Sequence, residues 1–442
     1  MSEWKKVKIG DFLKRKRIPI QLESDKEYKL ITIKLYHKGV YLRGNKKGSE
    51  IHSNMYKVSK GDFILSGIDA RNGAFGIVPD SLDGAIVTND FWYFDIDELI
   101  IKKEFFLWLT STPVFLDACQ KASMGETQRI RLQKDAFFNY QIKCPSIEYQ
   151  DEFLARINPI IEKIKIIQSE TEKQTEYAKL LRQNILQQAI EGKLTAAWRK
   201  QNPVQKGNPD YDAEALFEQI QKERNNEKKQ KELSPITDEE KTFEIPNGWK
   251  WVRLGEICKK ITDGTHHSPI NTPIGDYMYI TAKNIKSTGV ELSDITYVTK
   301  GIHDEIYSRC NVEYGDILYI KDGATTGIVC INQIKEPFSL LSSVALLKTN
   351  FDNKYLKLAM ESPSFYEQTR NQMYGVAITR VTLEKMINAI IPFPPIEEQE
   401  EIVKQVEKHL QTVIDLENQI TEREQLTKQI MQGILKDAFE EI

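Results

Sequence analysis

Two long stretches of the chain carry apolar residues that alternate in steps of four and three. This spacing is typical of a coiled-coil seam and predicts helices over about residues 148–191 and 397–440. At 1.5 Å per residue each helix would be about 60 Å long. The predicted seam positions are Phe153, Ile157, Ile160, Ile164, Ile167, Leu181 and Ile185 in the first stretch, and Ile402, Val406, Val413, Leu416, Ile420, Ile430 and Ile434 in the second.

The middle of each seam is polar, with Thr171 and Gln174 in the first stretch and Arg423 and Thr427 in the second. A single helix cannot bury its own seam, so the simplest arrangement pairs the two helices. Polar residues in a seam commonly fix register and orientation. Antiparallel pairing would bring the two polar centres side by side. It would also place one globular domain at each end, related by a pseudo-two-fold axis.

The segments before the two helices resemble one another, which indicates an internal repeat. The sequence WKKVKIGD at residues 4–11 reappears as WKWVRLGE at residues 249–256, and GDFIL at 61–65 corresponds to GDILY at 315–319. Gln150 corresponds in the same way to Gln399. We therefore expect globular domains at 1–146 and 247–395, long helices at 147–193 and 396–442, and a linker with a short helix at 194–246.

Each globular half has mixed α/β character, so the predicted fold class is α+β. Alternating apolar and polar residues favour strands at 29–35 and 315–320. Helices are expected at 104–121 and at 353–373. Gly192 follows the first long apolar pattern, at the position where glycine commonly ends a helix.

Charge is unevenly distributed along the 442 residues, although the formal net charge is only −3. Residues 1–60 carry 16 Lys or Arg against six Asp or Glu, whereas residues 396–442 carry five against 12. A basic first domain and an acidic last segment indicate a polyanion partner at one surface and a different partner at another.

Cysteine usage and hydropathy point to a cytoplasmic protein. The five cysteines are dispersed without a CxxC pair, which is typical of reduced thiols rather than of a disulfide framework or a zinc site. No apolar run approaches the length of a membrane span, and the first residues lack the apolar core of a signal peptide.

The sequence lacks the common catalytic signatures. There is no GxGxxG motif, and the glycines at 39 and 44 are not followed by Lys-Ser/Thr, so the phosphate-loop pattern fails. The Asn/Asp-Pro-Pro-Tyr/Phe motif of amino-methyltransferases is missing. His266-His267 lies in a loop without clustered cysteines or carboxylates, which favours a partner-facing loop over a metal site. We expect no catalytic, cofactor or metal site in this chain.

Three segments resemble the specificity subunits of type I restriction-modification enzymes. They are residues 180–194 (LLRQNILQQAIEGKL), residues 394–399 (PPIEEQ) and the linker-to-domain join at 243–256 (FEIPNGWKWVRLGE). The motifs occur in the order expected for that family, and the resemblance covers nearly the whole chain.

This resemblance implies a non-catalytic subunit with two target-recognition domains that reads a bipartite, asymmetric site on double-stranded DNA. Its partners would be two adenine methyltransferase (modification) subunits and restriction/translocase subunits of a phage-defence system. S-adenosylmethionine, ATP and Mg²⁺ would then belong to those partner subunits.

Residue chemistry suggests which side chains contact DNA, because Lys and Arg are the usual contacts to phosphates and bases. The candidates in the first domain are Lys34, Lys38, Arg43, Lys46, Lys47, Arg71, Arg129 and Arg131. Those in the second domain are His266, His267, Lys283, Asn284, Lys286, Lys321, Tyr374 and Arg380. Two other functions stay open at this point: a bridging scaffold without a DNA role, and a stand-alone DNA-binding regulator.

Overall fold

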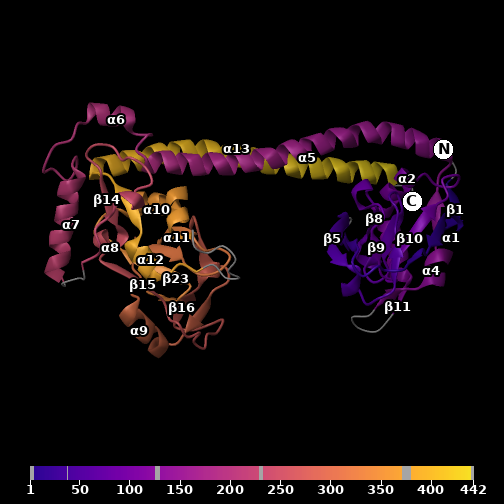
Figure 1. Cartoon of the computed structure of the whole chain (residues 1–442), viewed down its shortest axis with the longest axis horizontal. Helices are drawn as coiled ribbons and strands as arrows, with labels where there is room; N and C mark the ends of the chain where they lie inside the picture. Colours follow the sequence, from indigo (N-terminus) through magenta and orange to yellow (C-terminus); the bar gives the residue numbers. More distant parts are fainter. Residues whose placement is uncertain (1–3, 37, 125–129, 228–231, 371–379, 440–442) are drawn as a thin grey trace. The chain divides into compact units, whose positions relative to one another are not determined.

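The computed structural model describes residues 4–36, 38–124, 130–227, 232–370 and 380–439. The chain divides into two compact units, Met1–Glu172 with Thr421–Ile442 and Lys173–Ile420. Each unit combines one β-rich domain with a stretch of both long helices, α5 (Ile147–Ile190) and α13 (Ile396–Phe439) (Figure 1). We call residues 4–146 domain 1 and residues 247–395 domain 2.

Domain 1 contains a four-stranded sheet of order β2-β10-β7-β8 and a five-stranded sheet of order β3-β6-β9-β4-β5. A separate antiparallel pair joins β1 to β13, and a short pair joins β11 to β12. The strands are β1 (Lys5–Lys8), β2 (Leu13–Lys16), β3 (Pro19–Ile20), β4 (Glu27–Lys34), β5 (Gly39–Lys47), β6 (Met55–Lys57), β7 (Phe63–Ser66), β8 (Phe75–Ile77), β9 (Ile86–Val87), β10 (Phe91–Ile96), β11 (Ser123–Met124), β12 (Arg131–Leu132) and β13 (Gln141–Cys144).

Four α-helices accompany these strands in the described part of domain 1, and phenylalanines dominate the core between them. Phe63, Phe106 and Phe115 are buried and meet edge-to-face, with ring centroids 4.8–6.4 Å apart. Such pairs add to the stabilisation from apolar burial. The helices are α1 (Ile9–Phe12), α2 (Lys103–Thr110), α3 (Pro113–Lys121) and α4 (Lys134–Asn139).

Domain 2 repeats the central plan of domain 1. Its four-stranded sheet has the order β15-β23-β20-β21, which matches β2-β10-β7-β8, and β14 pairs with β24 as β1 pairs with β13. The strands are β14 (Lys250–Arg253), β15 (Lys260–Asp263), β16 (Tyr277–Ile280), β17 (Ile285–Lys286), β18 (Gly289–Val290), β19 (Thr296–Val298), β20 (Ile317–Ile320), β21 (Val329–Ile331), β22 (Ser339–Leu340), β23 (Val344–Lys348) and β24 (Ile390–Phe393). The helices are α8 (Leu254–Ile257), α9 (Lys300–Arg309), α10 (Asn353–Glu361), α11 (Pro363–Arg370) and α12 (Leu383–Asn388).

One expectation about the domains was wrong in the same way in both copies. The single helix expected at 104–121 is broken into α2 and α3, and the one expected from 353 is broken into α10 and α11. Pro113 and Pro363 begin the second helix of each pair. A proline disfavours helical conformation in the residue before it, so each helix restarts at its proline.

The two long helices pair antiparallel, as the seam predicts. In the first unit, Ile434 of α13 packs against the cluster that contains Phe153 and Ile157 of α5. In the second unit, Ala178 and Ile185 of α5 share a cluster with residues of the first half of α13. Buried residues recur every seven positions in both helices, at 157, 164, 171, 178 and 185, and at 406, 413, 420 and 427.

The seam differs from the predicted one at several positions. Ile160, Ile167 and Leu181 are 37, 40 and 44% exposed, and Ile430 is 51% exposed. One of the two predicted seam positions in each heptad is buried. The second contact is made by the residue after the predicted one, for example by Ile161 instead of Ile160. Leu416 is half-buried against the core cluster, while Phe153, Ile157, Ile164, Ile185, Ile402, Val406, Val413 and Ile420 are buried.

The polar centres of both helices bond to their own backbone. Thr171 and Thr427 are buried, and each hydroxyl donates to the carbonyl four residues earlier, at 2.7 Å. This local bond satisfies the hydroxyl donor inside the seam.

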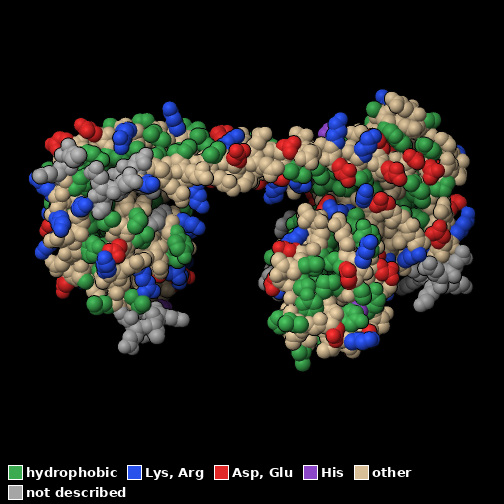
Figure 2. Space-filling model, turned by 180° about the vertical axis from the view of Figure 1, so that it is seen from behind, with side chains coloured by type: hydrophobic (Ala, Val, Ile, Leu, Met, Phe, Trp, Pro, Cys, Tyr) green, Lys and Arg blue, Asp and Glu red, His purple; other side chains and the backbone are tan. Residues whose placement is uncertain are grey.

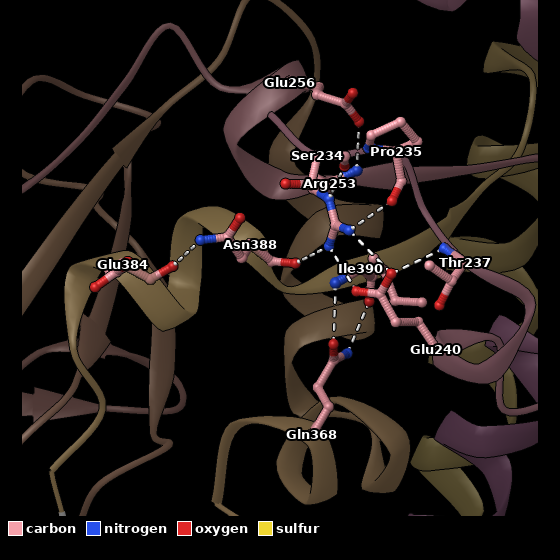
Figure 3. A network of polar contacts seen from close by, with 10 residues as sticks. All are labelled: Ser234, Pro235, Thr237, Glu240, Arg253, Glu256, Gln368, Glu384, Asn388 and Ile390. Carbon is pink, nitrogen blue, oxygen red and sulfur yellow. Dashed lines mark hydrogen bonds and ion pairs between the residues drawn. The ribbon is translucent and has the colours of Figure 1, made fainter. Parts of the chain in front are cut away.

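The linker packs onto domain 2. It contains α6 (Ala196–Gln201), α7 (Ala213–Glu227) and a segment of residues 232–245 that we call the strap. The Arg253 guanidinium of β14 donates to the carbonyls of Ser234 and Pro235 and pairs with the carboxylate of Glu240 at 2.8 Å (Figure 3). The strap is therefore an integral part of the structure of domain 2.

The linker begins and ends at one place. Gly192 ends α5 with φ +69°, as the glycine signal predicts. A Cβ at Gly192 would lie 2.6 Å from Pro246 Cγ and 3.1 Å from Trp249 Cζ2. Glycine is required here both by its left-handed backbone and by the close approach of the returning chain.

Candidate nucleic-acid interface

The edge strand of the five-stranded sheet in domain 1, β5, is largely exposed. It forms an antiparallel hairpin with β4, from Glu27 opposite Lys47 to Lys34 opposite Gly39, with a shift of register between Leu30 and Ile31. In β4, Tyr28, Ile31 and Ile33 are buried, whereas β5 is largely exposed along its length. The core holds one strand of the hairpin and leaves the other facing solvent.

The hairpin is basic and aromatic. Residues 27–47 contain six Lys or Arg and one carboxylate, Glu27. The Lys34 ammonium lies 4.2 Å from the ring centroid of Tyr41, and Tyr36, at φ +60°, is 72% exposed. Lysines alone on an edge strand can serve to prevent sheet-to-sheet association. Exposed Tyr36, Tyr41 and Leu42 among them favour contact with a partner instead.

The hairpin brings together most of the predicted first-domain candidates. Lys34, Lys38, Arg43, Lys46 and Lys47 all lie on it and are exposed. Arg71 lies beside its tip, because the Tyr36 N–H donates to the carbonyl of Asn72 at 2.9 Å. Arg131 lies on β12 and forms an ion pair with Asp90 at 3.0 Å. Arg129 lies outside the described residues.

Two of the predicted second-domain candidates are structural. Lys321 is 1% exposed, and its ammonium lies 2.7 Å from Asp322 and 3.4 Å from Asp263. Asn284 is 2% exposed; its side chain accepts from the Thr281 N–H and donates to the carbonyl of Asp294. The expectation that these two contact DNA is wrong, because a buried side chain cannot reach a base or a phosphate.

Lys321 nevertheless supports an exposed cationic cluster. His266 Nε2 lies 3.3 Å from Asp263, and Arg380 Nε lies 3.3 Å from Asp322. Arg309, at the end of α9, also lies 3.4 Å from Asp263 and donates to the carbonyl of Gly264. The side chains of His266, Arg309 and Arg380 are 49, 51 and 61% exposed. The buried Asp263 and the half-buried Asp322 thus hold three exposed basic side chains on one surface.

Sequence reasoning missed Arg309, because only the fold brings the end of α9 to Asp263. The other candidates are more dispersed. His267 is exposed in the loop after β15, Lys283 pairs with Asp294 at 3.0 Å, and Lys286 pairs with Glu291 at 3.3 Å. Tyr374 lies outside the described residues.

Lysine and arginine side chains are scattered over both domains in the view of Figure 2, with no single continuous stripe on that face. Each domain therefore offers a local cationic surface of its own: the β4–β5 hairpin in domain 1, and the His266–Arg309–Arg380 cluster in domain 2.

Other chemistry is sparse in the part of the chain that the structure describes. No group of three or more His, Cys, Asp or Glu is placed to hold a metal ion there. Within the same ranges no helix is long and apolar enough to cross a membrane. Burial raises the pKa of Cys119, Cys258, Cys310 and Cys330 to about 12, so these four thiols stay protonated at neutral pH.

A family model described as the type I restriction modification DNA specificity domain matches residues 1–177 and 246–426. The chain belongs to this family. The two matched segments correspond to the two copies of the internal repeat.

Individual relatives are more distant. The chain is 23% identical over 351 residues to the type I restriction enzyme EcoDI specificity subunit of Escherichia coli, covering 78% of this chain and 71% of that protein. It is 27% identical over 245 residues to the EcoAI specificity subunit of the same organism, covering 52% of this chain. The chain spans 40% of the length of the EcoAI protein and 42% of the EcoEI protein that it matches.

The fold matches a solved chain from work on complex assembly and conformational transition of the type I R-M system. The TM-score is 0.64 at 18% identity, covering 99% of this chain and 97% of that one. At this identity the match establishes the fold, with two β-rich domains and two long helices.

Proposed function

We propose that this chain is the DNA specificity subunit of a type I restriction-modification complex, and that it reads a bipartite, asymmetric DNA site with one half per domain. The observation that carries this proposal is the contrast between the two cationic surfaces. Two domains with the same central sheet expose different basic residues, on a hairpin in domain 1 and on a carboxylate-anchored cluster in domain 2. Different surfaces suit different half-sites.

In domain 1 the hairpin would enter the major groove. That groove admits a two-stranded β-ribbon, and its base edges carry the full sequence code. Lys46 and Lys47, at the base of the hairpin, would contact phosphates, while Arg43 and the residues near the tip would reach the bases. In domain 2, Arg309 and Arg380 would take the corresponding roles.

The chain would act with partner subunits that carry the chemistry. We propose two adenine methyltransferase subunits, together with restriction/translocase subunits, as the partners. S-adenosylmethionine, ATP and Mg²⁺ would bind to them. The purified chain alone would then show no nuclease, methyltransferase or ATPase activity.

The long helices offer a docking surface for such partners. On α5, Tyr177, Leu180 and Leu181 are 44–64% exposed. Exposed apolar side chains grouped on a helix favour a protein partner over DNA. Replacing Leu180 and Leu181 with Glu should abolish co-purification of the methyltransferase, while Gln168→Glu, at another exposed position of the same helix, should leave it intact.

Domain exchange tests the function. Residues 1–146 are replaced by those of another family member, the chain is reconstituted with an adenine methyltransferase subunit, and the methylated adenines are mapped. We expect one half-site to change and the other to stay, and exchange of residues 247–395 should give the converse. A site that stays unchanged, or that changes in both halves after either exchange, would contradict one domain per half-site.

A further inference from the structure

The two copies of the repeat differ in what covers their equivalent surfaces. In domain 2 the linker covers β14 and α8. Arg224 of α7 donates to the carbonyls of Gly255 and Glu256, and the Leu233 side chain lies over Gly255. Domain 1 has the same strand and helix as β1 and α1. There Gly10 and Asp11, which correspond to Gly255 and Glu256, are exposed.

The linker meets domain 2 through two ion pairs. Lys250 pairs with Glu214 of α7 at 2.7 Å, and Arg253 pairs with Glu240 of the strap at 2.8 Å. Burial leaves the Arg253 side chain only 5% exposed. Figure 3 shows Glu240 and the carbonyls of Ser234, Pro235 and Asn388 converging on this guanidinium.

Domain 1 keeps both cations. The repeat aligns Lys250 with Lys5 and Arg253 with Lys8, and it adds a third cation, Lys6, in place of Trp251. All three lysines are exposed. Among the described residues no carboxylate lies within ion-pair distance of their ammonium groups, and the Lys8 ammonium donates only to the side-chain oxygen of Asn139, at 3.2 Å.

The local backbone is the same in both copies. The Lys8 N–H donates to Asp11 at 2.8 Å, and the Arg253 N–H donates to Glu256 at 2.7 Å. β1 pairs with β13 in the register in which β14 pairs with β24. The cations of domain 1 are therefore presented on the same scaffold as those that the linker covers in domain 2.

We propose that the surface formed by Lys5, Lys6, Lys8 and Gly10 binds an acidic, extended segment of a partner protein, in the manner in which the strap covers domain 2. We choose an acidic segment as the ligand of this surface because its charge complements that of the lysines. Residues 232–245 contain five carboxylates and one lysine, and one of these carboxylates, Glu240, pairs with Arg253, the equivalent of Lys8. Lys6 replaces Trp251, which packs against Phe243 with ring centroids 5.0 Å apart. The partner segment should therefore carry a carboxylate where the strap has Phe243.

A protein segment is favoured over DNA because the equivalent surface is seen to hold a peptide. The strap offers backbone carbonyls and a leucine as well as carboxylates, and Gly10 is exposed at the position where Gly255 meets that leucine. This site is separate from the β4–β5 hairpin, and the proposal does not depend on the DNA-reading function.

The test uses the full chain and a fluorescent peptide of residues 232–245. Domain 2 already holds its own strap, so the peptide reports on domain 1. Fluorescence anisotropy should show saturable binding with one site per chain. Lys5→Glu with Lys8→Glu should weaken it about tenfold, because the attraction between this cationic surface and the acidic peptide becomes repulsion. A peptide with Glu240→Gln should bind more weakly than the parent peptide.

The matched control is Lys46→Glu with Lys47→Glu, which makes the same charge change on the hairpin of the same domain. It should leave peptide binding unchanged. Lack of saturable binding, or equal binding by the Lys5/Lys8 variant, would overturn the proposal. It would also be overturned if that variant lost DNA affinity instead, because the surface would then be a DNA contact.

Discussion

The two domains anchor their long helices with the same glutamine but with different tryptophan partners. Gln150 and Gln399 lie on the first turn of α5 and α13, and each donates to the carbonyl of the proline five residues earlier, at 3.0 and 2.8 Å. Trp4 of domain 1 meets Tyr149 edge-to-face at 5.7 Å. Trp249 of domain 2 instead donates its indole N–H to Glu398 at 2.7 Å.

The reason for the difference is the linker. Glu398 is 1% exposed and also accepts from Thr195 at 2.7 Å and from Arg199, both in the linker. A buried carboxylate needs such partners. Domain 1 has a ring at the equivalent position, where no linker segment supplies donors. Both domains thus keep the glutamine bond that fixes the start of the long helix. The side chain before that glutamine differs according to whether the linker packs over it.

The same pattern holds for a buried aspartate. Asp62 and Asp316 occupy the same position in the repeat, and each accepts from the backbone N–H three residues earlier. Asp62 is neutralised by Lys16 of β2 at 2.7 Å, and Asp316 by Lys348 of β23 at 2.7 Å. The requirement for a cation is retained, while the strand that supplies it has changed.

The largest expected effect on stability comes from substitution of Glu398, where the two domains differ most in their hydrogen bonds. Glu398→Ala removes the acceptor of three donors and leaves the Arg199 charge without its partner, so we expect a loss of about 3–5 kcal/mol from the stability of domain 2. Tyr149→Ala in domain 1 removes one ring contact and should cost about 1 kcal/mol. Chemical denaturation followed by hydrogen exchange of β14 and β1 measures both. Equal losses would show that the linker network adds no stability.

The next effect concerns the two cationic surfaces. Reversing Lys34, Lys38, Arg43, Lys46 and Lys47 together should lower DNA affinity at least about a hundredfold and flatten its salt dependence, because fewer counterions are released. Lys60→Glu with Lys121→Glu is the control, since these lysines already pair with Asp80 and Asp117 elsewhere on domain 1. DNA affinity that survives the five reversals would remove the hairpin from the interface.

The smallest expected effect concerns the strap and its dependence on pH. The hydrogen bond from Arg253 lowers the pKa of Glu240 below its usual value of 4.5. The stability that this pair contributes is therefore complete above pH 4.5 and is lost as the pH falls through the lowered folded-state pKa. Hydrogen exchange of residues 232–245 should rise over that range. Glu240→Gln should show raised exchange at every pH; an unchanged acid response in that variant would assign the effect to another group.

Sequence pattern predicted those features that a local rule determines. Heptad spacing predicted both long helices, and Gly192 marked the end of the first one. The repeat predicted two domains of one plan. The exact buried face of each helix was harder to predict. Neighbouring apolar residues such as Ile160 and Ile161 satisfy the spacing equally well, and only packing selects between them.

The site was only partly predictable, since residue type does not reveal burial. Lys321 and Arg309 look equally available in the sequence, but the fold buries Lys321 beside Asp263 and Asp322 and leaves Arg309 at the surface. The linker was the larger omission. Its polar composition predicted a connector, whereas its carboxylates serve as the counterions of Lys250 and Arg253.

The contact between Gly192 and the Pro246–Trp249 turn brings the two ends of the linker together, so the linker forms a closed loop on the rest of the chain. A segment whose two ends touch can lengthen or shorten without moving the elements that it joins, and each doubling of such a loop costs only about 0.6 kcal/mol of closure entropy. Insertions in the exposed stretch at 203–207 should therefore be tolerated far better than insertions in either long helix. The linker is the part of this architecture in which new sequence can accumulate without a structural penalty elsewhere.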